Sequence, residues 1–135
     1  MTRYDIKGKQ YLKTGDKYYV ADLGLRYFIL GRREDSRGHI LENVVYLELL
    51  RRGYEVYIGK IDNYEIDFVA INSKGIEYYQ VSETVREKKT LERELRGLDS
   101  IRDHYPKYLL TMDIDPETSY NGIKKINVLD WLLEK

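Results

Sequence analysis

The sequence lacks cysteine and contains only two histidines, His39 and His104. Disulfides, thiolate zinc sites and cysteine nucleophiles are therefore excluded, as is a histidine-rich metal site. Long apolar runs are missing too, since none approaches the roughly 20 residues that a membrane-spanning helix needs. The first ten residues are polar and charged, unlike a signal peptide. These absences predict a cytoplasmic protein with no membrane segment.

A surplus of either charge is also missing, because 23 acidic residues balance 23 basic ones. Strong nucleic-acid binders usually carry a basic surplus, so any contact with DNA must come from a local patch. One candidate patch interleaves lysine with tyrosine near the N-terminus, at Lys7, Lys9, Lys13 and Lys17 and at Tyr4, Tyr11, Tyr18 and Tyr19. That pattern suits phosphate contact and base stacking. It also suits a solvated hairpin edge on which lysine discourages aggregation, the interpretation we favour.

What the sequence does contain predicts one globular body. Its 135 residues are 42% hydrophobic and 34% charged, which suits a single core. Tyrosine outnumbers phenylalanine by 14 to 2. A tyrosine buries its ring and keeps a hydroxyl at a wet edge, so this composition suits a small, partly exposed sheet.

The expected elements form an N-terminal part, residues 1–35, packed on a core of residues 36–135. In the first part we expect a hairpin over 3–21 and a short helix over 22–30. The core opens with a helix from Ser36 to about Arg52, which Gly53 ends.

Three strands are expected next, over 54–58, 64–71 and 76–82, and residues 72–75 have good turn chemistry between the last two. A helix over 90–102, a strand over 108–112, a loop through Pro116 and Gly122 and a final helix around Trp131 complete the chain. The order from Ser36 is α-β-β-β-α-β-α. It predicts an α/β fold, and the helix before the fourth strand permits a parallel crossover.

The chemistry of interest lies in the central hairpin. If Ser73 and Lys74 form its loop, Asp67 lies opposite Gln80 and Glu65 lies opposite Ser82. These four side chains would then share one face, while the apolar side chains that alternate with them, Ile66, Phe68 and Ala70, would enter the core.

Asp67 lies in an otherwise apolar strand, and two interpretations compete for it. It is either a carboxylate at a strand end that faces water or a basic residue, or it is a ligand for Mg²⁺, which prefers oxygen and can activate water.

A family resemblance rests on these residues. The run Glu65-Ile66-Asp67-Phe68-Val69-Ala70, then Tyr79-Gln80-Val81-Ser82, with Glu42 on the preceding helix, resembles the PD-(D/E)XK nuclease core. Further segments resemble the C-terminal domain of unknown function that follows an AAA+ ATPase module in many bacterial and archaeal proteins. They are Tyr4-Asp5-Ile6-Lys7-Gly8-Lys9, Leu41-Glu42-Asn43, Arg51-Arg52-Gly53-Tyr54 and Tyr105-Pro106-Lys107-Tyr108.

The resemblance implies a restriction-endonuclease-like α-β-β-β-α-β core, a mixed sheet flanked by helices. It also implies a longer protein, whose N-terminal module would bind ATP, because no phosphate-binding loop of the form G-x-x-x-x-G-K-[ST] occurs here.

Carried over residue by residue, the nuclease site falls on Glu42, Asp67, Gln80 and Ser82. Glu42 and Asp67 match the metal-binding acids. Gln80 is neutral where a carboxylate belongs, and Ser82 stands where a lysine would orient the water, so the site is expected to be degenerate. A displaced lysine, Lys88 or Lys89, would leave an active Mg²⁺-dependent nuclease instead. The third alternative is a structural or oligomerisation domain.

Two further groups have simpler interpretations. His39 and Glu42 are helix neighbours, for which a local hydrogen bond is favoured over a shared metal. The stretch Asp113, Asp115 and Glu117 lacks the glycine and final glutamate of a calcium loop and is interpreted as a solvated turn.

Overall fold

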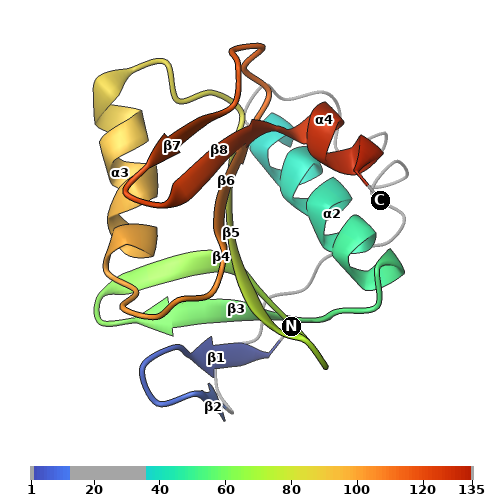
Figure 1. Ribbon diagram of the computed structural model, residues 1–135, viewed down its shortest axis with the longest axis vertical. Helices are drawn as coiled ribbons and strands as arrows, with labels where there is room; N and C mark the ends of the chain where they lie inside the picture. The colour runs from blue at the N-terminus through green and yellow to red at the C-terminus, as the bar shows by residue number, and fades with distance from the viewer. Residues whose placement is uncertain (1, 13–35, 135) are drawn as a thin grey trace.

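The computed structural model describes residues 2–12 and 36–134, which form one mixed α/β layer structure (Figure 1). A single eight-stranded sheet has the order β2-β1-β3-β4-β5-β6-β8-β7. The elements are β1 (Arg3–Asp5), β2 (Gln10–Leu12), α2 (Ser36–Arg51), β3 (Glu55–Ile61), β4 (Tyr64–Asn72), β5 (Gly75–Ser82), α3 (Lys88–Asp99), β6 (Lys107–Thr111), β7 (Thr118–Tyr120), β8 (Ile123–Asn127) and α4 (Val128–Leu133).

Helices cover both faces of this sheet. In Figure 1, α3 lies on one side, and α2 and α4 lie on the other. α2 buries Leu41, Val45 and Leu49, spaced four residues apart on one helical face. Gly53, at φ 90°, ends the helix as expected for a left-handed cap.

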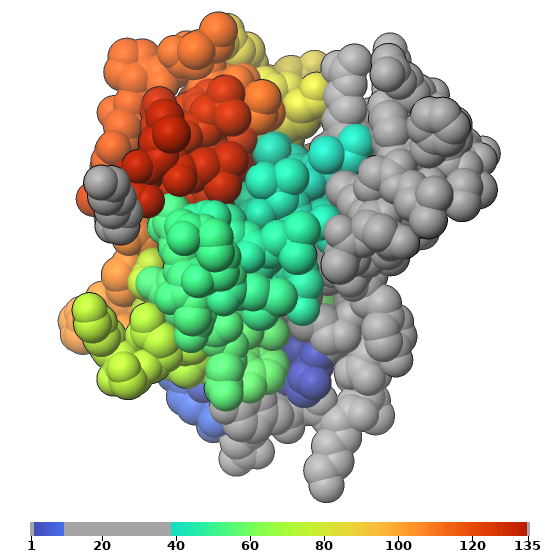
Figure 2. All heavy atoms as spheres, turned by 90° about the vertical axis from the view of Figure 1, so that its right-hand side faces the viewer, coloured from blue at the N-terminus to red at the C-terminus, as the bar shows by residue number. Residues whose placement is uncertain are grey.

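The α2 and α4 helices also touch each other, as the space-filling view in Figure 2 shows. The Arg52 guanidinium lies 4.4 Å from the centre of the Trp131 ring and donates to the Trp131 carbonyl at 2.7 Å. This contact attaches the last helix to the end of α2.

The parallel crossover is confirmed, because β5 pairs with β6 in parallel and α3 connects them. The expected loop through Pro116 and Gly122 is wrong in part. Residues 118–127 form the hairpin β7–β8, and β8 pairs with β6 in parallel. Gly122, at φ 86°, serves the tight turn of that hairpin rather than an open loop.

The sheet separates two apolar cores. On the α3 side the core includes Ile66, Val69, Tyr78, Leu98 and Leu109. On the α2 and α4 side it includes Phe68, Ala70, Tyr79, Val81, Leu110 and Trp131.

Two consecutive tyrosines explain part of the tyrosine-rich composition. Tyr78 and Tyr79 are 0% and 1% exposed and enter opposite cores. Each hydroxyl donates to a carboxylate, at 2.6 Å to Asp103 and at 2.6 Å to Glu77 respectively. Both rings are therefore fully buried, which is more burial than the predicted partly exposed sheet implies. Burial raises the pKa of both tyrosine hydroxyls.

The N-terminal hairpin joins the same sheet. β1 pairs with β2 in antiparallel register and with β3 in parallel register. The rest of the predicted N-terminal part, including the helix over 22–30 and the lysines Lys13 and Lys17, lies outside the described residues. Lys7 and Lys9 of the candidate basic patch pair with Asp62 at 2.7 Å and Asp103 at 3.0 Å.

Candidate functional site

The predicted register of the central hairpin is confirmed. The β4–β5 pairs run from Asn72 opposite Gly75 to Phe68 opposite Tyr79. At the next position side chains replace the regular ladder: the Asp67 N–H donates to Gln80 Oε1 at 2.7 Å, and the Val81 N–H donates to Asp67 Oδ2 at 2.9 Å. Asp67 and Gln80 therefore tie the two strands together where the backbone pairing ends.

The cause of this change is a bulge in β4. Its other neighbour, β3, pairs Tyr57 with Val69 and Gly59 with Ile66, so two β4 residues face the single residue Ile58. The extra residue breaks the in-out alternation of the strand. Ile66 consequently lies in the α3-side core and Phe68 in the α2-side core.

Two expectations about faces are therefore wrong. Ile66 does not share a face with Phe68 and Ala70, because the bulge reverses the alternation between them. Glu65 does not pair with Ser82 either. It lies opposite Lys60 of β3, and its carboxylate meets Arg3 at 3.3 Å.

Ser82 takes a local role at the end of β5. Its hydroxyl donates to the Thr84 carbonyl at 3.1 Å, in the turn that leads to α3. Lys88 and Lys89 are exposed in the first turn of that helix. Of the carried-over residues, the structure joins Asp67 and Gln80 directly and places Ser82 at the end of β5.

Glu42 lies on α2. Its side chain is 17% exposed, and Oε2 lies 3.9 Å from His39 Nδ1. That distance is too long for the expected hydrogen bond and marks a loose ion pair when His39 is protonated.

A residue that sequence reasoning missed, Glu94 on α3, lies near Glu42. Burial raises the pKa of Glu94, the charge of Arg93 opposes this shift, and the negative charge of Glu42 adds to it. The two carboxylates thus repel each other although their helices cover opposite faces. The sequence held a signal: Glu94 sits three residues after Leu91 and four before Leu98, on the apolar stripe of α3.

The described residues do not assemble a metal-binding cluster. Across residues 2–12 and 36–134, no group of three acidic or histidine side chains lies close enough to hold an ion. Glu42 and Asp67 alone would supply two ligands, fewer than a protein-held Mg²⁺ site with a catalytic water would favour.

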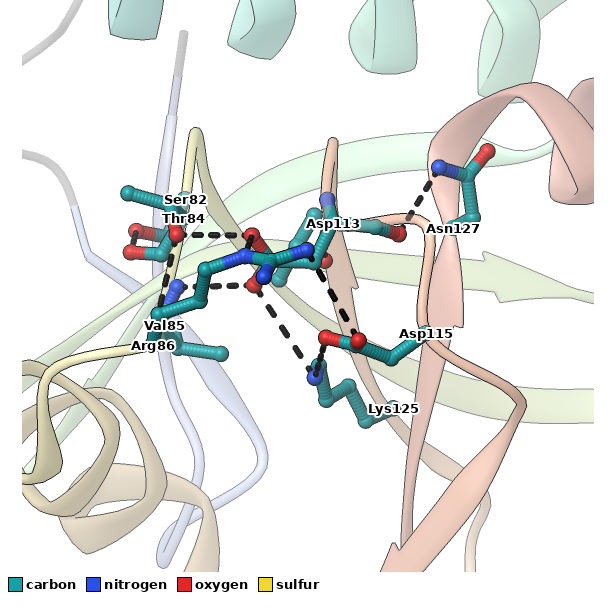
Figure 3. A network of polar contacts seen from close by, with 9 residues as sticks. Ser82, Thr84, Val85, Arg86, Asp113, Asp115, Lys125 and Asn127 are labelled. Carbon is teal, nitrogen blue, oxygen red and sulfur yellow. Dashed lines mark hydrogen bonds and ion pairs between the residues drawn. The ribbon is translucent and has the colours of Figure 1, made fainter.

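A second acidic region, around Asp113, corrects another expectation (Figure 3). Asp113 is 5% exposed rather than solvated. It accepts from Thr84 Oγ1 at 2.7 Å, from the Val85 N–H at 3.0 Å and from Arg86 Nε at 3.1 Å.

These contacts join the β5–α3 turn to the end of β6, and Lys125 of β8 lies 3.9 Å away. Burial acts to raise the pKa of Asp113, but hydrogen bonds from Thr84, Val85 and Arg86 and the charge of Lys125 lower it overall. Such a satisfied carboxylate has a structural role.

A cavity of about 290 Å³ lies at the opposite edge, near the start of β6 and β8, and Asp103, Tyr105 and Lys107 help to line it. Burial acts to raise the pKa of Asp103, but hydrogen bonds from Tyr78, Lys9 and Lys107 lower it to about 2. Lys107 Nζ donates to two backbone carbonyls and to Asp103. These polar groups bind one another, so the cavity offers little chemistry for a ligand.

Comparison with known proteins adds relatives but no activity. An uncharacterized protein of Haemophilus influenzae is 44% identical over 132 residues, which are 98% of this chain and 32% of that protein. An uncharacterized protein of Methanocaldococcus jannaschii is 37% identical over 91 residues, 61% of this chain and 20% of that protein. No family model and no solved structure matches. No described helix is long and apolar enough to cross a membrane. The chain spans about a third or less of the length of these curated relatives.

Proposed function

We propose that this chain is a nuclease-like domain that no longer cuts, serving as a recognition module in a longer protein that carries an ATPase module. In this proposal the sheet and its helices are a restriction-endonuclease-like core. The observation that carries it is the contact between Asp67 and Gln80. The residues at the expected metal position bond to each other's strands, so they fix the backbone instead of presenting ligands.

The loss of catalytic groups supports the same proposal. An amide at position 80 cannot offset the charge of a metal as a carboxylate does, and the Ser82 hydroxyl is directed to a backbone carbonyl. The exposed Lys88 and Lys89 lie in the first turn of α3, beyond the strand. The limited coverage of the longer relatives supports a module rather than a whole protein.

A metal titration tests the absence of catalysis. We expect calorimetry with Mn²⁺ or Mg²⁺ to give no stoichiometric binding in the micromolar range and no cleavage of plasmid DNA. Asp67→Asn is the matched variant, because Asn keeps an acceptor for the Val81 N–H and removes the charge. Micromolar Mn²⁺ binding that Asp67→Asn abolishes would establish the active nuclease instead, with Glu94 beside Glu42 as the first replacement acid to examine.

Restoring the motif tests the kinship itself. Gln80→Glu with Ser82→Lys rebuilds the pattern of an intact nuclease site next to Asp67. Two adjacent carboxylates repel, so the variant should melt at a lower temperature in EDTA and recover in Mn²⁺. Ser82→Lys alone is the control and should show no Mn²⁺ effect. If the double variant also ignores Mn²⁺, the nuclease resemblance is lost and a structural domain is favoured.

A further inference from the structure

The exposed side of α3 carries a row of cations. Lys89, Arg93 and Arg96 recur at i, i+4 and i+7, so they share one helical face. That face lies opposite Leu98, which is fully buried in the core. All three basic side chains are exposed. The acids Glu92 and Asp99 lie on the neighbouring row, at the flank of this face.

Within the part of the chain that the structure describes, two of these cations, Lys89 and Arg96, form no ion pair, and the third, Arg93, has only a long contact with its neighbour. Elsewhere basic side chains generally pair with carboxylates, as Arg51 and Arg52 do with Glu48. Arg93 approaches Glu94 at 3.7 Å. Among the basic side chains that the structure describes, those that form no ion pair are Lys60, Lys74, Lys88, Lys89, Arg96 and Arg102. Most of this set lies on α3 or directly after it.

The arrangement fits a line of phosphates better than a membrane or an apolar protein surface. A rise of about 1.5 Å per residue spreads Lys89 to Arg96 over about 10 Å of helix. A DNA strand presents a phosphate about every 3.4 Å along its axis, so several phosphates come within reach. None of the exposed large apolar residues lies on α3, so this face lacks the apolar side that inserts into a bilayer.

We propose that the row of Lys89, Arg93 and Arg96 binds the phosphate backbone of duplex DNA without reading its sequence. This inference rests on the proposed recognition function and names its partner and its surface. It also assigns Lys89 a binding role in place of a displaced catalytic one. Contact with about three phosphates predicts a slope of about −3 in log K against log salt.

The test is fluorescence anisotropy with a labelled duplex of about 20 base pairs, which is long enough for one such contact. The titration is repeated at salt concentrations between about 50 and 200 mM KCl, because salt cations compete with the protein for the phosphates. The variant K89Q/R93Q/R96Q removes the row with a residue that keeps helix propensity. The control R51Q/K74Q/K124Q removes the same charge from exposed positions elsewhere. We expect the α3 variant to lose at least tenfold in affinity and most of the salt slope, and the control to stay within about twofold of the parent chain.

Equal losses in both variants would reduce the effect to net charge and overturn the inference. So would absence of duplex binding by the parent chain, or binding to phosphatidylserine vesicles in preference to the duplex. The same DNA is assayed with Mn²⁺ for cleavage. Cleavage with intact α3-dependent binding overturns the non-cutting proposal and leaves this inference standing, whereas no binding and no cleavage overturns the inference alone.

Discussion

Asp113 is a buried acid and Glu94 a partly buried one, and their surroundings differ in kind. The Asp113 side chain is 4% exposed and is surrounded by donors and cations, so its pKa is lowered. The Glu94 side chain is 17% exposed, and burial raises its pKa. The charge of Arg93, 3.7 Å away, opposes this shift, and the negative charge of Glu42 adds to it. A satisfied carboxylate stabilises a fold, whereas a strained one near other acids is what functional sites contain.

The largest effect should come from removing Asp113. Asp113→Ala leaves Thr84, Val85 and Arg86 without their acceptor, and we expect a loss of about 3 kcal/mol in the free energy of unfolding. Urea denaturation measures it. Asp115→Ala, at a side chain 45% exposed, is the control and should cost no more than about 0.5 kcal/mol. Similar costs for both would remove the distinction between a buried hub and a surface ion pair.

A slightly smaller loss is expected at Gly59, which pairs with Ile66 beside the bulge. A Cβ there would lie 2.8 Å from Ile66 Cβ and 2.8 Å from Val69 Cγ2. Gly59→Ala should cost about 1–3 kcal/mol through overpacking. In Gly97→Ala the new atom meets the end of a flexible chain, Ile66 Cδ1, at 3.0 Å, and helix propensity offsets the strain. If Gly59→Ala is neutral in urea denaturation, β4 does not depend on this close approach.

Gln80→Ala should cost about 1–2 kcal/mol, because the Asp67 N–H loses its acceptor at the strand break. Gln80→Glu keeps an acceptor for that N–H, but it should be less stable at pH 7 than at pH 4, because the ionised carboxylate of the variant repels the Asp67 carboxylate. Thermal melts at pH 4 and pH 7 check this order. Equal stability of Gln80→Ala and the parent chain would mean that water replaces the amide without cost and that the tie is not structural.

The opposite sign is expected at Glu94. A raised pKa in the folded state means that stability is lost as pH rises above 4.5 and through the folded pKa. Glu94→Gln should therefore stabilise the protein at pH 7 by roughly 0.5–1 kcal/mol, with little effect at low pH. Urea denaturation over a range of pH measures the free energy of unfolding at pH 7 and at low pH. Destabilisation at pH 7 would show that the carboxylate is satisfied and would remove the contrast with Asp113.

A lowered pKa gives the reverse pH dependence, and Asp103 provides it. Its contribution is present above the ordinary value of 3.8 and is lost as pH falls toward about 2. Acid unfolding of the parent chain should steepen in that range, and Asp103→Asn should flatten it. An unchanged acid transition in Asp103→Asn would assign the steepness to other carboxylates, Asp113 first.

Local chemistry determined what the sequence could predict. The turn over 72–75 set the β4–β5 register because Asn72 accepts from the Lys74 N–H at 2.9 Å and Gly75 takes φ 144°. The limits of α2, the parallel crossover and the approach of Asp67 to Gln80 follow from such short-range patterns. The turn and the limits of α2 depend on neighbours within a few residues, and the register that the turn sets brings Asp67 to Gln80.

Tertiary structure decided the rest. The bulge opposite Ile58 arises from pairing with β3, and the partners of Asp113 come from separate segments. The negative charge of Glu42 on α2 adds to the raised pKa of Glu94 on α3. These features depend on which residues, distant in the sequence, lie next to each other in the fold. The pattern of charge and hydropathy along the chain does not specify those neighbours. The residue types at the candidate site were therefore predictable from sequence, whereas their orientation and electrostatic state were set by packing.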